Sequence, residues 1–187
     1  MIYRPIVLDK EIKFSKKKFI VSKADLKGNI IFTNKNFSEV SGYDEAELIG
    51  APHNILRHPD MPRAVFFVVW QALLAGQPIS GVIKNLAKSG EYYWVIADLE
   101  PKFNTRGEIV ALTAFRRAAP QDVIDTTEEL YETMLAIEKK HGMEKSLAYL
   151  EAFLEEHNLS YNEFIEELIK PKGFVAILLS AFKKMVG

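Results

Sequence analysis

The spacing of hydrophobic residues near the start of the chain alternates between that of strands and that of short helices. Residues 19–21 and 29–33 are rich in β-branched and aromatic side chains and flank a turn at Lys27-Gly28, which predicts a hairpin of two strands. Two short helical stretches follow, at 35–41 and 44–49, and each is followed directly by glycine, a common helix stop. This part of the chain therefore begins as a mixture of strands and helices.

Prolines then interrupt the pattern before one longer helix. Pro52, Pro59 and Pro62 exclude a long regular element, so we expect residues 51–62 to be irregular or barely helical. From residue 61 or 62 to Gly76, apolar residues recur at steps of three and four, which predicts a helix of about four turns. Proline is compatible with the first turn of such a helix.

The pattern then returns to strands and finally changes to helices. Segments 79–88, 91–101 and 108–117 are separated by short turn sequences, so we expect three antiparallel strands. After Pro120 the chain is acidic, and its apolar residues follow helical spacing. We expect an N-terminal segment (1–18), an α+β domain with helices on one face of a sheet (19–118) and an α-helical C-terminal extension (119–187).

Composition and charge narrow the class of protein. The chain has no cysteine, which excludes disulfides and cysteine-based metal sites. Residues 1–120 carry 17 basic and 12 acidic side chains and residues 121–187 carry 7 and 13, so opposite charges could help the two parts dock. The basic residues form no stripe, which argues against nucleic-acid binding. We expect a cytoplasmic protein, because no signal peptide and no apolar run of transmembrane length is visible.

The densest group of polar side chains lies in the proline-rich segment. Two imidazoles, a guanidinium and a carboxylate crowd residues 52–62, namely His53, Arg57, His58 and Asp60. Rigid backbone next to proline would fix their directions and make a ligand site. In the alternative interpretation, Asp60 caps the following helix and Arg57 bridges to Asp60 or faces solvent.

The strand at 79–88 supplies another candidate. A period of two places Ile79, Gly81, Ile83 and Asn85 on one face, so a side-chain amide would lie in the interior. A buried asparagine needs hydrogen-bond partners, which the backbone or a polar ligand could provide. An asparagine facing solvent, or a local bulge, fits the pattern as well. No motif for a catalytic nucleophile, phosphate loop or metalloprotease is present, and we expect no enzymatic activity.

Several of these segments together resemble a known family. The sequence Phe37-Ser-Glu-Val-Ser-Gly-Tyr is typical of PAS domains, and Arg57-His-Pro-Asp-Met-Pro resembles the PAS domains of bacterial aerotaxis receptors over residues 19–118. The resemblance implies a PAS fold with a five-stranded antiparallel sheet and flanking helices around FAD, a redox cofactor. It also implies that Arg57, His58 and Asp60 bind the cofactor and that Asn34 and Asn85 are polar positions of its pocket. His53 and Trp70 are further candidate cofactor-binding residues.

Two departures from the family keep alternatives open. Ile79 stands where those receptors tend to have tryptophan, so an aromatic contact to FAD would be lost. Haem held by His53 or His58, another ligand, or a cofactor-free module acting in dimerisation or docking remain alternatives. The receptors also continue into a membrane anchor and a signalling domain, and we expect neither in this protein. We therefore expect the soluble sensor of a two-protein energy-taxis system, which can form a homodimer and has a membrane-bound methyl-accepting chemotaxis-type receptor as partner.

Overall fold

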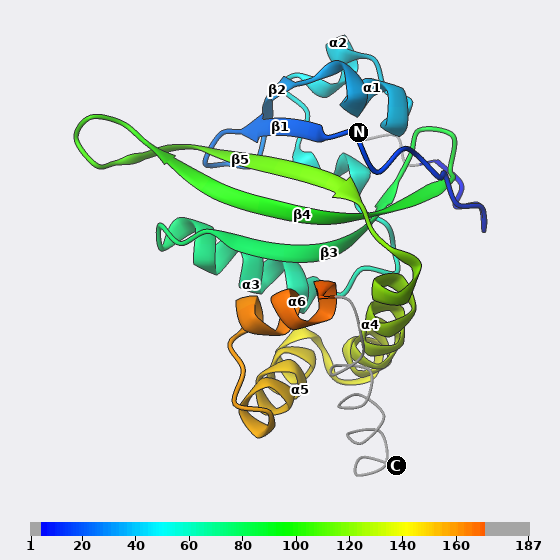
Figure 1. Cartoon of the computed structure of the whole chain (residues 1–187), viewed down its shortest axis with the longest axis vertical. Helices are drawn as coiled ribbons and strands as arrows, with labels where there is room; N and C mark the ends of the chain where they lie inside the picture. The colour runs from blue at the N-terminus through cyan, green and yellow to red at the C-terminus, as the bar shows by residue number, and fades with distance from the viewer. Residues whose placement is uncertain (1–4, 171–187) are drawn as a thin grey trace.

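The computed structural model describes residues 5–170, and the order of its elements confirms the predicted α+β fold (Figure 1). The first domain contains five strands, three α-helices and one 3-10 helix, and three further helices follow it. In chain order they are β1 (Ile20–Ala24), β2 (Ile30–Thr33), α1 (Lys35–Ser41), α2 (Glu45–Leu48), η1 (His53–Leu56), α3 (Arg63–Leu74), β3 (Ile79–Leu86), β4 (Tyr92–Phe103), β5 (Ile109–Ala118), α4 (Gln121–His141), α5 (Met143–Glu156) and α6 (Tyr161–Ile169).

The strands form one antiparallel sheet in the order β2-β1-β5-β4-β3. The N-terminal hairpin thus joins the C-terminal hairpin through β1 and β5, where Ser22 lies opposite Ala114 and Ile20 opposite Arg116. Helices α1, α2, η1 and α3 and their connections cover one face of the sheet, and Phe37, Leu48 and Leu56 are fully buried beneath them. This is the five-stranded sheet with flanking helices that the sequence led us to expect.

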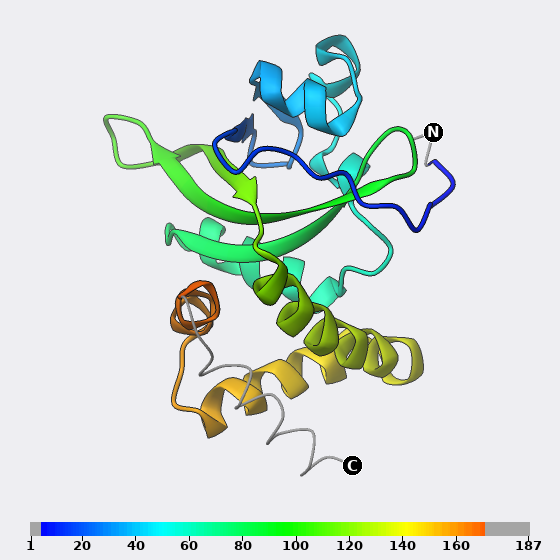
Figure 2. The same cartoon turned by 45° about the vertical axis from the view of Figure 1, so that its right-hand side comes forward.

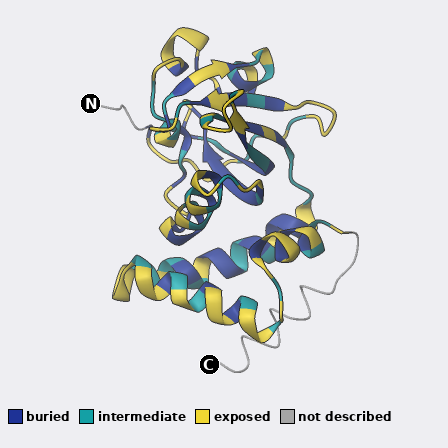
Figure 3. Ribbon diagram, turned by 90° about the vertical axis from the view of Figure 1, so that its left-hand side faces the viewer, coloured by how far each residue is buried: buried dark blue, intermediate teal, exposed yellow. Residues whose placement is uncertain are grey.

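The helical extension lies against the edge of the sheet that β3 forms (Figures 1 and 2). Helices α4 and α6 contact β3, and α5 contacts α3. Buried positions concentrate in the strands and on one side of the extension helices, whereas their other side is exposed (Figure 3). The extension therefore shares a core with the first domain.

Side chains complete the hydrogen bonds of the open edge of β3. The Ser80 amide donates to Asn162 Oδ1 (3.2 Å), and the Tyr131 hydroxyl donates to the Val82 carbonyl (2.8 Å). The Lys84 amide donates to the sulfur of Met61 (3.2 Å). An edge strand otherwise offers unpaired backbone groups to other chains, so these side chains take the place of a neighbouring strand.

Replacing Asn162 by alanine tests the contact with Ser80. The substitution also removes the hydrogen bond that Asn162 Nδ2 donates to the carbonyl of Pro78 (3.2 Å). We expect a loss of about 0.5–1 kcal/mol in the free energy of unfolding in urea, the usual net value of a hydrogen bond. Hydrogen exchange of the Ser80 amide should also become faster. Glu166→Ala, at an exposed position one turn along α6, is the control. An unchanged exchange rate at Ser80 would contradict this role of Asn162.

Two expectations from the sequence concern a membrane-spanning helix and the apolar segment near the C-terminus. Within residues 5–170, no helix is both long enough and apolar enough to cross a membrane. The apolar sequence of residues 174–186 predicts a helix that packs on this chain's own helices, dimerises, docks to a receptor or lies at a membrane surface. These residues lie outside the described part of the chain.

Candidate functional site

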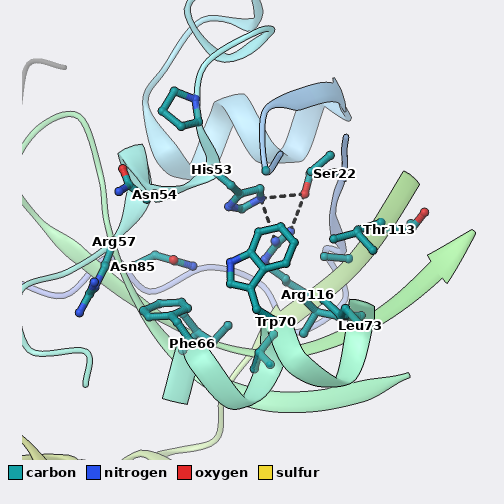
Figure 4. Close-up of a pocket in the computed structure, with 18 of the residues that line it drawn as sticks. Ser22, His53, Asn54, Arg57, Phe66, Trp70, Leu73, Asn85, Thr113 and Arg116 are labelled. Atoms are coloured by element: carbon teal, nitrogen blue, oxygen red, sulfur yellow. Dashed lines mark hydrogen bonds between the residues drawn. The ribbon is translucent and has the colours of Figure 1, made fainter. Parts of the chain in front are cut away.

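A cavity of about 400 Å³ lies between the inner face of the sheet and helices η1 and α3. Its volume is within the range of small-molecule sites in proteins, roughly 300–1,000 Å³. The walls are mainly apolar, with Ile83, Leu99 and Leu112 from the strands and Phe66 and Trp70 from α3. Figure 4 shows the polar side chains in two places, His53, Ser22 and Arg116 in one and Asn85 and Arg57 in the other.

Asn85 lies on the cavity face of β3, as the period of two predicted. Its partner in the sheet is Tyr93, and Ile83, two residues earlier, lines the same cavity. Only 5% of Asn85 is exposed, yet its Nδ2 has no hydrogen-bond acceptor among residues 5–170. A buried amide without an acceptor costs free energy, so its presence in a cavity wall points to an acceptor on a ligand.

A second polar group joins three elements that are far apart in the sequence. Arg116 on β5 donates from Nη1 to Ser22 Oγ on β1 (2.9 Å), and its Nη2 lies 3.0 Å from His53 Nε2. Ser22 Oγ also lies 3.1 Å from the same nitrogen of His53. Because the guanidinium can only donate, His53 Nε2 accepts and the imidazole is neutral. Burial, aided by the positive charge of Arg116, lowers the pKa of His53 to about 3.

Arg57 and Trp70, two of the candidate residues, also line the cavity. The Arg57 guanidinium donates from Nη2 to the carbonyl of Met61 (2.9 Å) and lies 5.1 Å from the ring centre of Phe66. Its backbone bridges to that of Asn85. The Arg57 side chain is half-buried. The Trp70 ring faces Gly28, where an added Cβ would lie 3.1 Å from the ring and φ is +85°, so the turn requires glycine.

Three of the predicted residues lie outside the cavity lining. Asn34 caps α1, because its side chain accepts from the amides of Phe37 and Val21 (both 3.1 Å). His58 is 2% exposed, and its Nδ1 accepts from the Asp60 amide (3.1 Å). A role for these side chains in binding stays a prediction, and it would act through the backbone that they hold.

Asp60 lies at the junction with the helical extension instead. Its carboxylate is 2.8 Å from Lys84 Nζ, and the same ammonium is 3.2 Å from Glu128 on α4. The idea that Asp60 caps α3 is wrong, because Pro62 is the N-cap. The Ala64 amide in the first turn of α3 donates instead to Glu138 of α4 (2.9 Å). The opposite charges of the two parts of the chain thus meet at Lys84.

Sequence reasoning missed Arg116 and Ser22. A signal existed for Arg116, because on its strand it is in phase with Leu112 and Ala114, both of which line the cavity. No sequence pattern indicated Ser22, because it comes close to Arg116 only through the pairing of β1 with β5. His53 Nε2 is already engaged by Arg116 and Ser22, which does not favour it as a haem ligand. No group of side chains within residues 5–170 is arranged to hold a metal ion.

Comparisons with known proteins agree with this fold. Residues 30–116 match the family model described as PAS fold. The chain is 35% identical to the aerotaxis receptor of Escherichia coli over 154 residues, which are 82% of this chain and 30% of that receptor. It is 33% identical to the nitrogen fixation regulatory protein of Klebsiella pneumoniae over 97 residues, 52% of this chain and 20% of that protein. The chain thus spans less than a third of either relative.

Solved structures support the fold alone, because their sequences are distant. A light-oxygen-voltage domain studied with a flavin analogue has a TM-score of 0.53 and 19% identity, covering 62% of this chain and 86% of that domain. The light-state structure of the light-oxygen-voltage domain of Aureochrome1 has a TM-score of 0.52 and 18% identity, covering 66% and 94%. This chain therefore contains a PAS domain that is homologous to the aerotaxis receptor of Escherichia coli.

Proposed function

We propose that this PAS domain is a sensor that holds a flavin, FAD, in the cavity and relays redox or energy state to a chemotaxis receptor. The observation that carries the proposal is the buried Nδ2 of Asn85, which has no acceptor among the described residues and lines a cavity of suitable size. A flavin ring has apolar faces and an edge of carbonyl oxygens and ring nitrogens. Its edge can accept from Asn85, while its faces fit between apolar walls.

Charges at the cavity support a ligand with phosphate groups. Lys27 and Arg57 are both among the lining residues, and a diphosphate is recognised by such cations. Ile79, the departure from the aerotaxis-receptor pattern, is not among the lining residues, whereas Leu99 opposite it is. The missing tryptophan thus removes an aromatic contact but leaves the polar groups of the cavity in place.

A visible absorption spectrum, followed by titration with FAD, tests the proposal. The purified protein is expected to carry flavin absorption or to acquire it when FAD is added. Asn85→Leu should weaken FAD binding about tenfold, because it removes a donor to the ligand. Its stability without ligand should hardly change, since an apolar side chain replaces an unsatisfied amide. Asn36→Leu is the control, because Asn36 is a half-buried amide on α1 that donates to the carbonyl of Phe19 (2.9 Å) and does not line the cavity; this variant should bind FAD like the unchanged protein.

The outcomes separate the alternatives. No flavin absorption, even after FAD is added, would contradict the proposal. A haem spectrum in its place would favour an imidazole ligand, and His53→Ala should then abolish it. A colourless protein that binds a receptor or itself would favour a cofactor-free interaction module.

The proposed output is a membrane-bound methyl-accepting chemotaxis-type receptor, on analogy with the aerotaxis receptor. Co-purification of this chain with such a receptor, compared between air and a reductant, tests the relay. Equal recovery under both conditions would contradict redox control of the partnership.

A further inference from the structure

We propose that Arg116 and Ser22 form an anion-selecting subsite, so that the cavity prefers a flat ligand whose buried end carries a negative charge. This inference deepens the proposed function, since it rests on the cavity being a ligand site, but it does not require the ligand to be a flavin. The candidate subsite lies on strands β1 and β5, away from the proline-rich segment that the sequence singled out.

The charge of Arg116 is buried without a counter-ion. Only 4% of the residue is exposed, and no carboxylate within residues 5–170 forms an ion pair with it. Its hydrogen-bond partners among residues 5–170, Ser22 and His53, are both neutral, and the ring of Phe37 lies 5.9 Å from the guanidinium carbon. Burial lowers the pKa of Arg116 to about 10, which still leaves it charged at neutral pH. A cation in this environment is costly unless something compensates it.

The neighbouring arginine shows that carboxylates are within reach of this strand. Arg117 points to the opposite face of β5, where its Nη1 lies 2.8 Å from Asp98 Oδ2, and a third of its side chain is exposed. The strand thus pairs its outward arginine with a carboxylate and leaves its inward arginine with neutral partners. Such an arrangement fits a binding residue better than a structural one.

The remaining donors define the chemistry of the ligand. A guanidinium has five N–H donors, and the contacts with Ser22 and His53 occupy two. His53 is neutral, so it adds no second charge at the subsite. Together with the amide of Asn85, the cavity presents donors and the buried positive charge of Arg116 between apolar walls. A planar apolar molecule with a carboxylate, or with an ionised carbonyl-type group, complements this pattern.

Two matched probes test the charge preference without any assumption about the natural ligand. 1-Naphthoate and 1-naphthamide share one ring system and differ in charge, and both can be titrated against the full chain by NMR. We expect the unchanged protein to bind the naphthoate about tenfold more tightly, and Arg116→Met to abolish that preference. Arg117→Met is the control and should keep it. Equal binding of the two probes by the unchanged protein would overturn the proposal.

A second measurement uses the protein without ligand. If Arg116 serves binding rather than folding, Arg116→Met should raise the melting temperature by roughly 3 °C, because it removes an uncompensated buried charge. Ser22 and His53 can still bond to each other after the change. A fall in melting temperature would assign Arg116 to the fold. Should the methionine variant not fold, Arg116→Gln gives the same neutral test while keeping donors.

The two proposals fail in different ways. If FAD does not bind but the naphthoate preference holds and is lost in Arg116→Met, the flavin assignment is wrong and the anion subsite stands. If FAD binds equally to the unchanged protein and to Arg116→Met, and the naphthoate preference is absent, the subsite is wrong and the flavin assignment stands.

Discussion

Replacing Phe37 by alanine is expected to lower the free energy of unfolding by about 3–5 kcal/mol, the usual cost of removing a fully buried aromatic ring. Phe37 on α1 has no exposed surface. Its ring packs edge-on against His53, with 6.1 Å between ring centres, and lies beside the guanidinium of Arg116. The substitution therefore removes core volume directly beside His53 and Arg116. Urea unfolding followed by circular dichroism measures the loss.

Phe37→Leu is the matched control. It keeps most of the volume and loses the aromatic contacts, so it should cost only about 1 kcal/mol. We expect both variants to weaken ligand binding, since each loosens the support of His53 and Arg116, but only the alanine variant to lose most of its stability. A loss below about 1 kcal/mol in Phe37→Ala would contradict the packing seen around α1.

Acid is expected to destabilise the protein through His53. In the unfolded chain an imidazole has a pKa near 6.5, whereas in the fold burial and the charge of Arg116 lower the pKa of His53 to about 3. Between these two values the unfolded state binds a proton that the folded state does not. Stability should therefore fall as the pH falls from about 6.5 towards 3, by about 1–3 kcal/mol between pH 6.5 and pH 4.

Urea unfolding at pH 8, 6.5, 5 and 4 measures this loss of stability. The free energy of unfolding of His53→Gln should fall less steeply with decreasing pH than that of the unchanged protein. Other groups titrate in the same direction. Burial also lowers the pKa of His58, and hydrogen bonds to Asn29 and Lys88 lower those of Asp25 and Glu47. The difference between the variant and the unchanged protein isolates His53. His141→Gln removes an exposed imidazole at the end of α4 and is the control. Parallel curves for His53→Gln and the unchanged protein would contradict the prediction.

The local pattern determined the elements of this protein. Helix 35–41 has the predicted bounds, because Asn34 caps its start and Gly42 adopts the left-handed conformation at its end. The last three strands differ from their predicted ranges by no more than two residues at either end. The period of two also placed Asn85 on the inner face of β3. These features depend on residues close together in the sequence, which a pattern can record.

The tertiary structure decided which polar groups meet. Arg116 reaches Ser22, 94 residues earlier, and His53, 63 residues earlier, because β5 lies beside β1 in the sheet. Asp60 likewise forms an ion pair with Lys84, which also contacts Glu128 of α4, and it does not line the cavity. Alternation along a strand tells which face a side chain occupies, but not which strand lies next to it. The proline-rich segment supplies His53 and Arg57 to the cavity lining, whereas the buried charge of Arg116 in the same lining emerged only from the order of the strands.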